Sequence, residues 1–166
     1  MPDHRETIDK ALTEHRDIRD TPKLTAASVT DVEALFALRQ VFTGWSQCAP
    51  EDLAAKQDQL LQTLNIIDRG LKGHWSHEEK AMENIFGEPL MKGFLYEHRE
   101  IATRIGKARV ALTGARPAGK DHQELLSRKT VIQDAVNPVL QAIEEHSNHE
   151  DMIFKMIKKG LENPPK

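Results

Sequence analysis

Proline and glycine divide this sequence into long segments whose apolar residues recur with the 3.6-residue period of an α-helix. No segment combines strand-type alternation with hairpin turns. The pattern predicts four principal helices over about residues 3–20, 50–86, 89–114 and 121–159. We therefore expect an all-α fold, an antiparallel four-helix bundle with one short extra helix, formed as a single domain over residues 1–166.

Local signals place the ends of these helices. Thr30-Asp31-Val32-Glu33 has the pattern of a capping box, which predicts the short extra helix, ending near Gly44. Pro50 suits the first turn of the helix that follows. Pro138 lies inside the last helix and should kink or divide it, because proline lacks a backbone donor and clashes with the preceding turn.

Composition excludes several classes of function. A formal net charge of −3 gives no general attraction to nucleic acid or to an anionic membrane. The longest apolar runs are far too short to span a bilayer. The first residues lack the layout of a signal peptide, and Cys48 is the only cysteine, so an internal disulfide and a cysteine metal cluster are excluded. We expect a cytoplasmic protein.

The histidines fall on the apolar stripes of the predicted helices. Each of the four principal helices has one there, and two of the helices add a glutamate: the residues are His15, His74, Glu78, His98, His146 and Glu150. An unpaired carboxylate in an apolar core would cost several kcal/mol, and a bound metal ion would offset that cost. Four residues turn about 40° around a helix, so each His-x-x-x-Glu pair can reach one metal ion.

A short internal repeat strengthens the metal hypothesis. Residues 74–79 (HWSHEE) and 146–151 (HSNHED) share the pattern His-x-x-His-Glu-acid. The repeat suggests two half-sites related by a pseudo-twofold axis, with one metal ion for each half. His77 and His149 are the middle histidines of the repeat, and second-shell, interface or purely structural roles remain open for them.

With this ordered set on four helices, the chain resembles the hemerythrin-like family. The resemblance implies that the six residues named above are ligands of two iron ions joined by an oxo or hydroxo bridge. Oxygen-carrying hemerythrins have a further histidine four residues before the third-helix ligand, where this chain has Phe94. The four-histidine, two-carboxylate set is more similar to iron-centre-repair proteins and iron-sensing hemerythrin domains. Asp151 is the alternative to Glu150, because oxygen carriers have this carboxylate five residues after the last-helix histidine.

The expected function is that of a non-haem di-iron protein that binds or reacts with a small diatomic molecule or peroxide. With both glutamates bridging, each iron would keep an open position for O2, NO or peroxide. A stress-protective role in donating iron to damaged iron–sulfur clusters is one alternative, and a metal-free helical interaction module is another. A zinc-protease motif and a ferritin-like Glu-x-x-His pair are both incomplete here.

Overall fold

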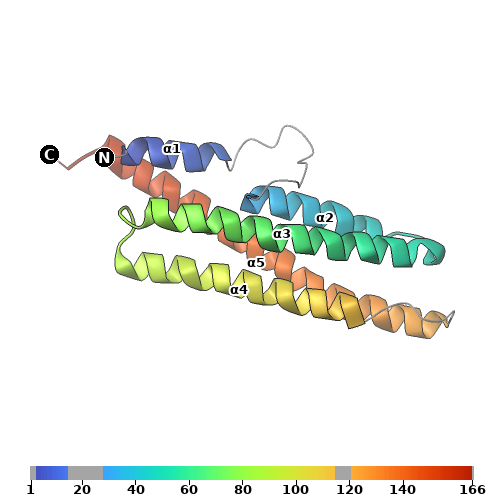
Figure 1. Ribbon diagram of the computed structural model, residues 1–166. Coiled ribbons are helices and arrows are strands. Elements are labelled where there is room, and N and C mark those ends of the chain that lie inside the picture. Colours follow the sequence, from blue (N-terminus) through green and yellow to red (C-terminus); the bar gives the residue numbers. More distant parts are fainter. Residues whose placement is uncertain (1–2, 15–27, 115–120, 166) are drawn as a thin grey trace.

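The computed structural model describes residues 3–14, 28–114 and 121–165 and is drawn in Figure 1. Within these ranges the structure is helical and contains no strand, as predicted. The elements in chain order are α1 (His4–Glu14), α2 (Asp31–Ser46), a 3₁₀ turn η1 (Pro50–Asp52), α3 (Leu53–Met82), α4 (Glu88–Gly114) and α5 (His122–Glu162).

The predicted capping box is confirmed at the start of α2. Thr30 Oγ1 accepts a hydrogen bond from the Glu33 backbone N–H at 3.2 Å, and the Glu33 carboxylate accepts one from the Thr30 N–H at 3.0 Å. The helix continues to Ser46, beyond the predicted end at Gly44. Of the predicted first helix, the structure describes α1 alone, and residues 15–20 lie outside the described residues.

Helix α5 runs without division through Pro138. Of the two predicted effects of this proline, a kink or a division of the helix, the structure excludes the division. Val136 and Val139, on either side of the proline, are fully buried, so core packing holds both halves in place despite the lost backbone donor. The carbonyl of Pro138 is in turn used by α4, because Arg104 Nη1 donates to it at 3.1 Å.

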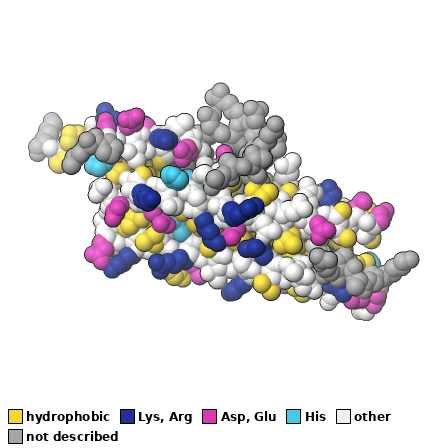
Figure 2. Space-filling view, in the orientation of Figure 1, with side chains coloured by type: hydrophobic (Ala, Val, Ile, Leu, Met, Phe, Trp, Pro, Cys, Tyr) yellow, Lys and Arg dark blue, Asp and Glu magenta, His cyan; other side chains and the backbone are white. Residues whose placement is uncertain are grey.

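The helices pack as a bundle elongated along α5. Helix α4 packs against α3 and α5, α2 packs against the same two helices, and α1 packs against α5. Figure 1 shows that α3 and α4 run in opposite directions and that α1 and α2 follow one another along one side. On the face seen in Figure 2, acidic and basic side chains are interspersed. Among the described helices we find none with a stretch long and apolar enough to cross a membrane.

Two separate apolar clusters form the core. The larger lies along the middle of the bundle and includes Leu60, Leu64, Leu71, Ile101, Ile105, Val139 and Ile143. The smaller joins α1 to the adjacent ends of the long helices through Ile8, Leu12, Met82, Phe86, Phe94 and Phe154. The buried ionisable residues of the long helices lie between the two clusters: His74 and Glu78 on α3, His98 on α4, and His146 and Glu150 on α5. The polar residues therefore form a layer between two apolar ones.

A close backbone approach joins the start of α2 to α3. The Val29 N–H donates to the Gly70 carbonyl at 2.9 Å. A Cβ at Gly70 would lie 2.3 Å from Val29 Cγ2 and 3.1 Å from its backbone nitrogen, so only glycine allows this contact. Because Gly70 lies one turn before His74, this contact sets how far the start of α2 lies from the polar layer.

We expect Gly70→Ala to lower the free energy of unfolding by about 1–3 kcal/mol, because the added methyl group overpacks the contact with Val29. Gly106→Ala on α4 is the matched control, since a Cβ there would meet nothing within 4 Å. The control should leave stability unchanged or raise it by up to about 1 kcal/mol through helix propensity. Urea unfolding of both metal-free variants measures the difference, and equal stabilities would contradict the assigned contact.

Candidate metal centre

The polar layer holds six buried side chains that could bind metal. All are at most 7% exposed: Asp31, His74, Glu78, His98, His146 and Glu150. Helix α3 supplies a histidine and a glutamate one turn apart, and α5 does the same, while α4 supplies one histidine and α2 its first residue. The five residues on α3, α4 and α5 lie on the core-facing stripes, as the apolar spacing around them predicts.

One group of potential ligands comes from the three long helices. Atoms of Glu78, His98, His146 and Glu150 lie within 4.8 Å of one another. His146 Nε2 is 3.1 Å from His98 Nε2 and 2.7 Å from Glu150 Oε1. Glu78 Oε2 is 3.8 Å from His98 Nε2. Two imidazoles and two carboxylates therefore converge on one volume.

A second group adjoins the first and shares Glu78 with it. Its members are Asp31, His74 and Glu78. His74 Nε2 lies 3.5 Å from Asp31 Oδ2 and 3.7 Å from Glu78 Oε2. A carboxylate common to two groups of ligands is the arrangement expected where one glutamate bridges two metal ions.

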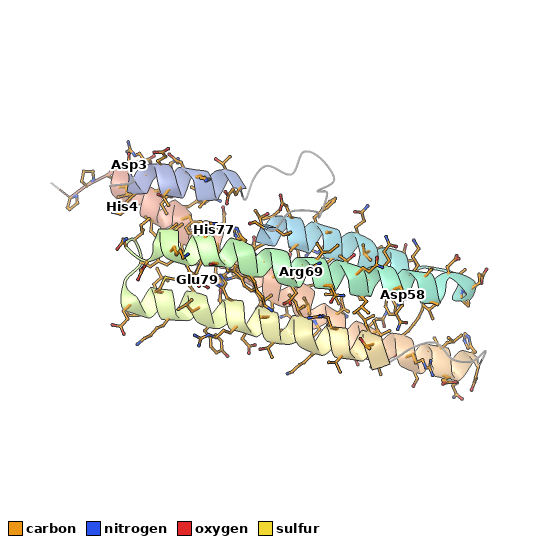
Figure 3. All side chains as sticks on the ribbon, viewed as in Figure 1. Asp3, His4, Asp58, Arg69, His77 and Glu79 are labelled. Atoms are coloured by element: carbon orange, nitrogen blue, oxygen red, sulfur yellow. The ribbon has the colours of Figure 1, made fainter. Side chains whose placement is uncertain are left out.

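Two further carboxylates orient the paired histidines from outside. His98 Nδ1 donates to Glu79 Oε1 at 2.7 Å, and His146 Nδ1 donates to Glu97 Oε2 at 2.7 Å. Figure 3 shows Glu79 on the side of α3 that faces α4, away from His77. A proton held on Nδ1 leaves the Nε2 lone pair directed into the layer, which is the tautomer of a metal-ligating histidine with a carboxylate behind it.

The approach of His98 to His146 requires a positive charge nearby. With both Nδ1 atoms donating outward, two neutral imidazoles would direct lone pairs at each other over 3.1 Å. That arrangement is repulsive unless a proton or a metal ion lies between the nitrogens or beside them. The buried carboxylates of Glu78 and Glu150 need the same compensation.

Aromatic rings close the layer around these histidines. Trp75 stacks on His98, with ring centroids 4.5 Å apart and planes 10° from parallel. Phe94 contacts the rings of both His98 and His146, at centroid distances of 5.0 and 5.2 Å. The ring of Phe94 therefore lies over the paired histidines and is the part of the smaller apolar cluster that borders the polar layer.

Without a metal ion, protons compensate the buried charge. Burial disfavours the protonated form of His146, but hydrogen bonds to Glu150 and Glu97 outweigh it and raise the pKa to about 11. For His74, burial is likewise outweighed by Asp31 and the pKa rises to about 9. For His98, burial and the charge of His146 outweigh the attraction of Asp31 and Glu97 and lower its pKa to about 3. One member of the histidine pair is thus protonated and the other neutral.

Burial and nearby charges also act together on the pKa values of the carboxyl groups. Burial raises the pKa of Glu150 to about 7, and burial together with the charge of Glu150 raises that of Glu78 well above its usual value. Burial also acts on Asp31, but its contact with His74 and the charges of the neighbouring histidines lower the pKa of its carboxyl. The layer is therefore a set of anions and imidazoles that hold protons a metal ion could replace.

The structure brings together five of the six residues predicted from the sequence. His15 lies outside the described residues. Of the two acids considered on α5, Glu150 is buried in the cluster, whereas Asp151 pairs with Lys155 on the surface. The middle histidines of the repeat differ: His149 donates to Glu97 Oε1 at 2.6 Å, whereas His77 is exposed and contacts the Gly73 carbonyl of its own helix.

Sequence reasoning missed Asp31, Glu79 and Glu97. Asp31 follows a capping threonine, and an acid in the first turn of a helix is usually a solvated partner of the helix dipole. Glu79 and Glu97 are adjacent in sequence to Glu78 and His98, on positions that point away from the apolar stripe. Of these three residues, only Glu79 had a signal in the sequence, because it is the final acid of the His-x-x-His-Glu-acid repeat.

Comparison of the chain with protein-family models, with curated proteins and with solved structures found no match.

Metal binding should release protons, because ions must displace those held by His146 and His74 at pH 7. Displacement becomes easier as pH rises toward these raised pKa values, so the apparent affinity for ferrous iron should increase from pH 6 to pH 8. Anaerobic calorimetry in buffers of different ionisation enthalpy measures the protons released. His122→Gln removes an exposed histidine outside the layer and should keep this dependence. An affinity independent of pH would contradict the assigned protonation.

Proposed function

We propose that this chain is a hemerythrin-like protein whose polar layer holds two iron ions and uses them to bind or react with O2, NO or peroxide. The main support for this proposal is that the Nε2 atoms of His98 and His146 lie close together beside Glu78 and Glu150. A carboxylate bound to Nδ1 orients each of these two histidines. Under this proposal His98, His146, Glu78 and Glu150 hold one ion, and His74 and the shared Glu78 hold the other. His15 is a further proposed ligand from the resemblance alone.

The ligand spacings fit a first-row metal ion. Ligand distances of about 2.1 Å at right angles place neighbouring ligand atoms about 3.0 Å apart. The spacings around His146 Nε2, 3.1 Å to His98 and 2.7 Å to Glu150, are close to that value. Mixed imidazole and carboxylate donors suit iron, and bound iron would supply redox chemistry and open coordination positions for a small ligand.

The helix arrangement supports the finer fold assignment. We propose an antiparallel four-helix bundle in which α3, α4 and α5 form three members and α1 followed by α2 forms the fourth. The packing of α2 against α3 and α5, and of α1 against α5, is what such a split member requires. Glu14 at the end of α1 and Ser28 before α2 both line the cleft that reaches His74 and Glu78.

The residues around the proposed iron ions would determine how a small ligand binds or reacts. Phe94 and Trp75 pack against the rings of the paired histidines, and Glu79 and Glu97 hold those histidines in one tautomer. Burial of these side chains strengthens their electrostatic interactions with a bound ligand. Phe94 stands where oxygen carriers have a further histidine, which favours a reactive site over reversible oxygen carriage.

A second candidate function is the donation of iron to another protein. A cleft of about 290 Å³ between α1 and α3 is lined in part by His74, Glu78 and Ala81. Among the described residues this cleft reaches the half of the layer that contains His74, and a labile ion there could be transferred. Iron transfer to a cluster-free acceptor would favour donation, whereas turnover with NO or peroxide would favour the first function.

We expect protein purified in air to contain about two irons per chain and to absorb in the near ultraviolet as a ferric pair. Glu78→Ala and His98→Ala should lose both the iron and the absorption, because each removes a central ligand. Asp151→Asn is the matched control beside Glu150→Gln: the control should keep two irons and Glu150→Gln should not. Iron-free protein, or zinc bound equally by all variants, would exclude a di-iron centre at these residues.

A further inference from the structure

We infer that Asp31 is an additional metal ligand, supplied by the first residue of α2 to the ion held by His74 and Glu78, and that metal binding there fastens the start of α2 to α3. The inference rests on the metal centre proposed above. It adds a carboxylate that the histidine and glutamate pattern does not contain, and it assigns that carboxylate to one of the two ions.

The Asp31 carboxylate is oriented for coordination. Its side chain is fully buried, and Oδ1 accepts a hydrogen bond from Trp75 Nε1 at 3.2 Å. Among the described residues, the other oxygen, Oδ2, has no hydrogen-bond partner, and it lies 3.5 Å from His74 Nε2. One oxygen is thus fixed by the protein, and the second is directed at the layer.

Three buried atoms face one another at this point, and none of them has a hydrogen-bond partner within the described ranges. They are Asp31 Oδ2, His74 Nε2 and Glu78 Oε2, which belong to one group of potential ligands within 4.8 Å. A buried polar atom without a partner destabilises the fold, and more so where the group is charged. A single cation bound by all three would satisfy them together.

Helix capping does not account for the buried position of Asp31. The Thr30 hydroxyl and the Glu33 carboxylate already cap the start of α2, where they accept from the N–H groups of Glu33 and Thr30. An acid that served only the helix dipole would remain in solvent, because burial would add a desolvation cost without improving that interaction. Asp31 instead lies in the polar layer, held by a tryptophan that also stacks on the ligand His98.

The contact between Val29 and Gly70 places Asp31 at the correct level of the bundle. The backbone hydrogen bond between them fixes the chain two residues before Asp31 against α3, one turn before His74. Helix α2 therefore starts beside the His74 imidazole. Metal coordination by Asp31 would add a second link between α2 and α3 next to that hydrogen bond.

Asp31→Asn tests the inference with almost no change in side-chain volume. The amide oxygen can still accept from Trp75, but the group no longer provides a carboxylate. Glu33→Gln is the matched control, because it removes an acid from the same helical turn while keeping an acceptor for the Thr30 N–H. Both variants and the wild type are titrated anaerobically with ferrous iron, and hydrogen exchange is measured with and without the metal.

We expect wild type and Glu33→Gln to bind two ions and Asp31→Asn to bind one tightly, with the second weakened at least tenfold. Iron should slow exchange at the start of α2 in wild type and Glu33→Gln but not in Asp31→Asn. Two ions bound by Asp31→Asn with wild-type affinity would overturn this inference alone, as would unchanged wild-type exchange on iron binding. Wild type that binds no iron would overturn the proposed centre as well.

Discussion

The structure depends on the compensation of buried negative charge. Glu78 and Glu150 lie between two apolar clusters, where an isolated carboxylate would cost several kcal/mol. The surrounding imidazoles, oriented from outside by Glu79 and Glu97, can compensate that charge either with protons or with a metal ion. The helices therefore pack around a polar layer whose electrostatics are balanced only when cations of one kind or the other are present.

The layer also joins segments that are distant in sequence. His98 and His146 are 48 residues apart and contact through Nε2, while Asp31 and Trp75 are 44 residues apart and share a hydrogen bond. The first pair connects α4 to α5, and the second connects α2 to α3. Polar contacts of this kind fix the rotation and the relative height of neighbouring helices more narrowly than apolar packing does.

The sequence predicted the helices and the buried histidines because both depend on local signals. Helix starts at Thr30 and Asp121 follow from capping side chains, and the stripe positions of His74, His98 and His146 follow from the helical period. The continuity of α5 through Pro138 could not be predicted from local signals, because it depends on packing against other helices. The roles of Asp31, Glu79 and Glu97 depend on the same relative placement, which no pattern within one helix contains.

The division of the apolar core has a consequence for how the molecule unfolds. The smaller cluster, which holds α1 against the ends of the long helices, has few members and is separated from the larger one by the polar layer. Local unfolding of that end therefore breaks few apolar contacts, and in metal-free protein it need not involve the rest of the bundle. Ions bound across α3, α4 and α5 would couple the two ends into one cooperative unit, so loss of metal would convert global unfolding into partial opening at the α1 end.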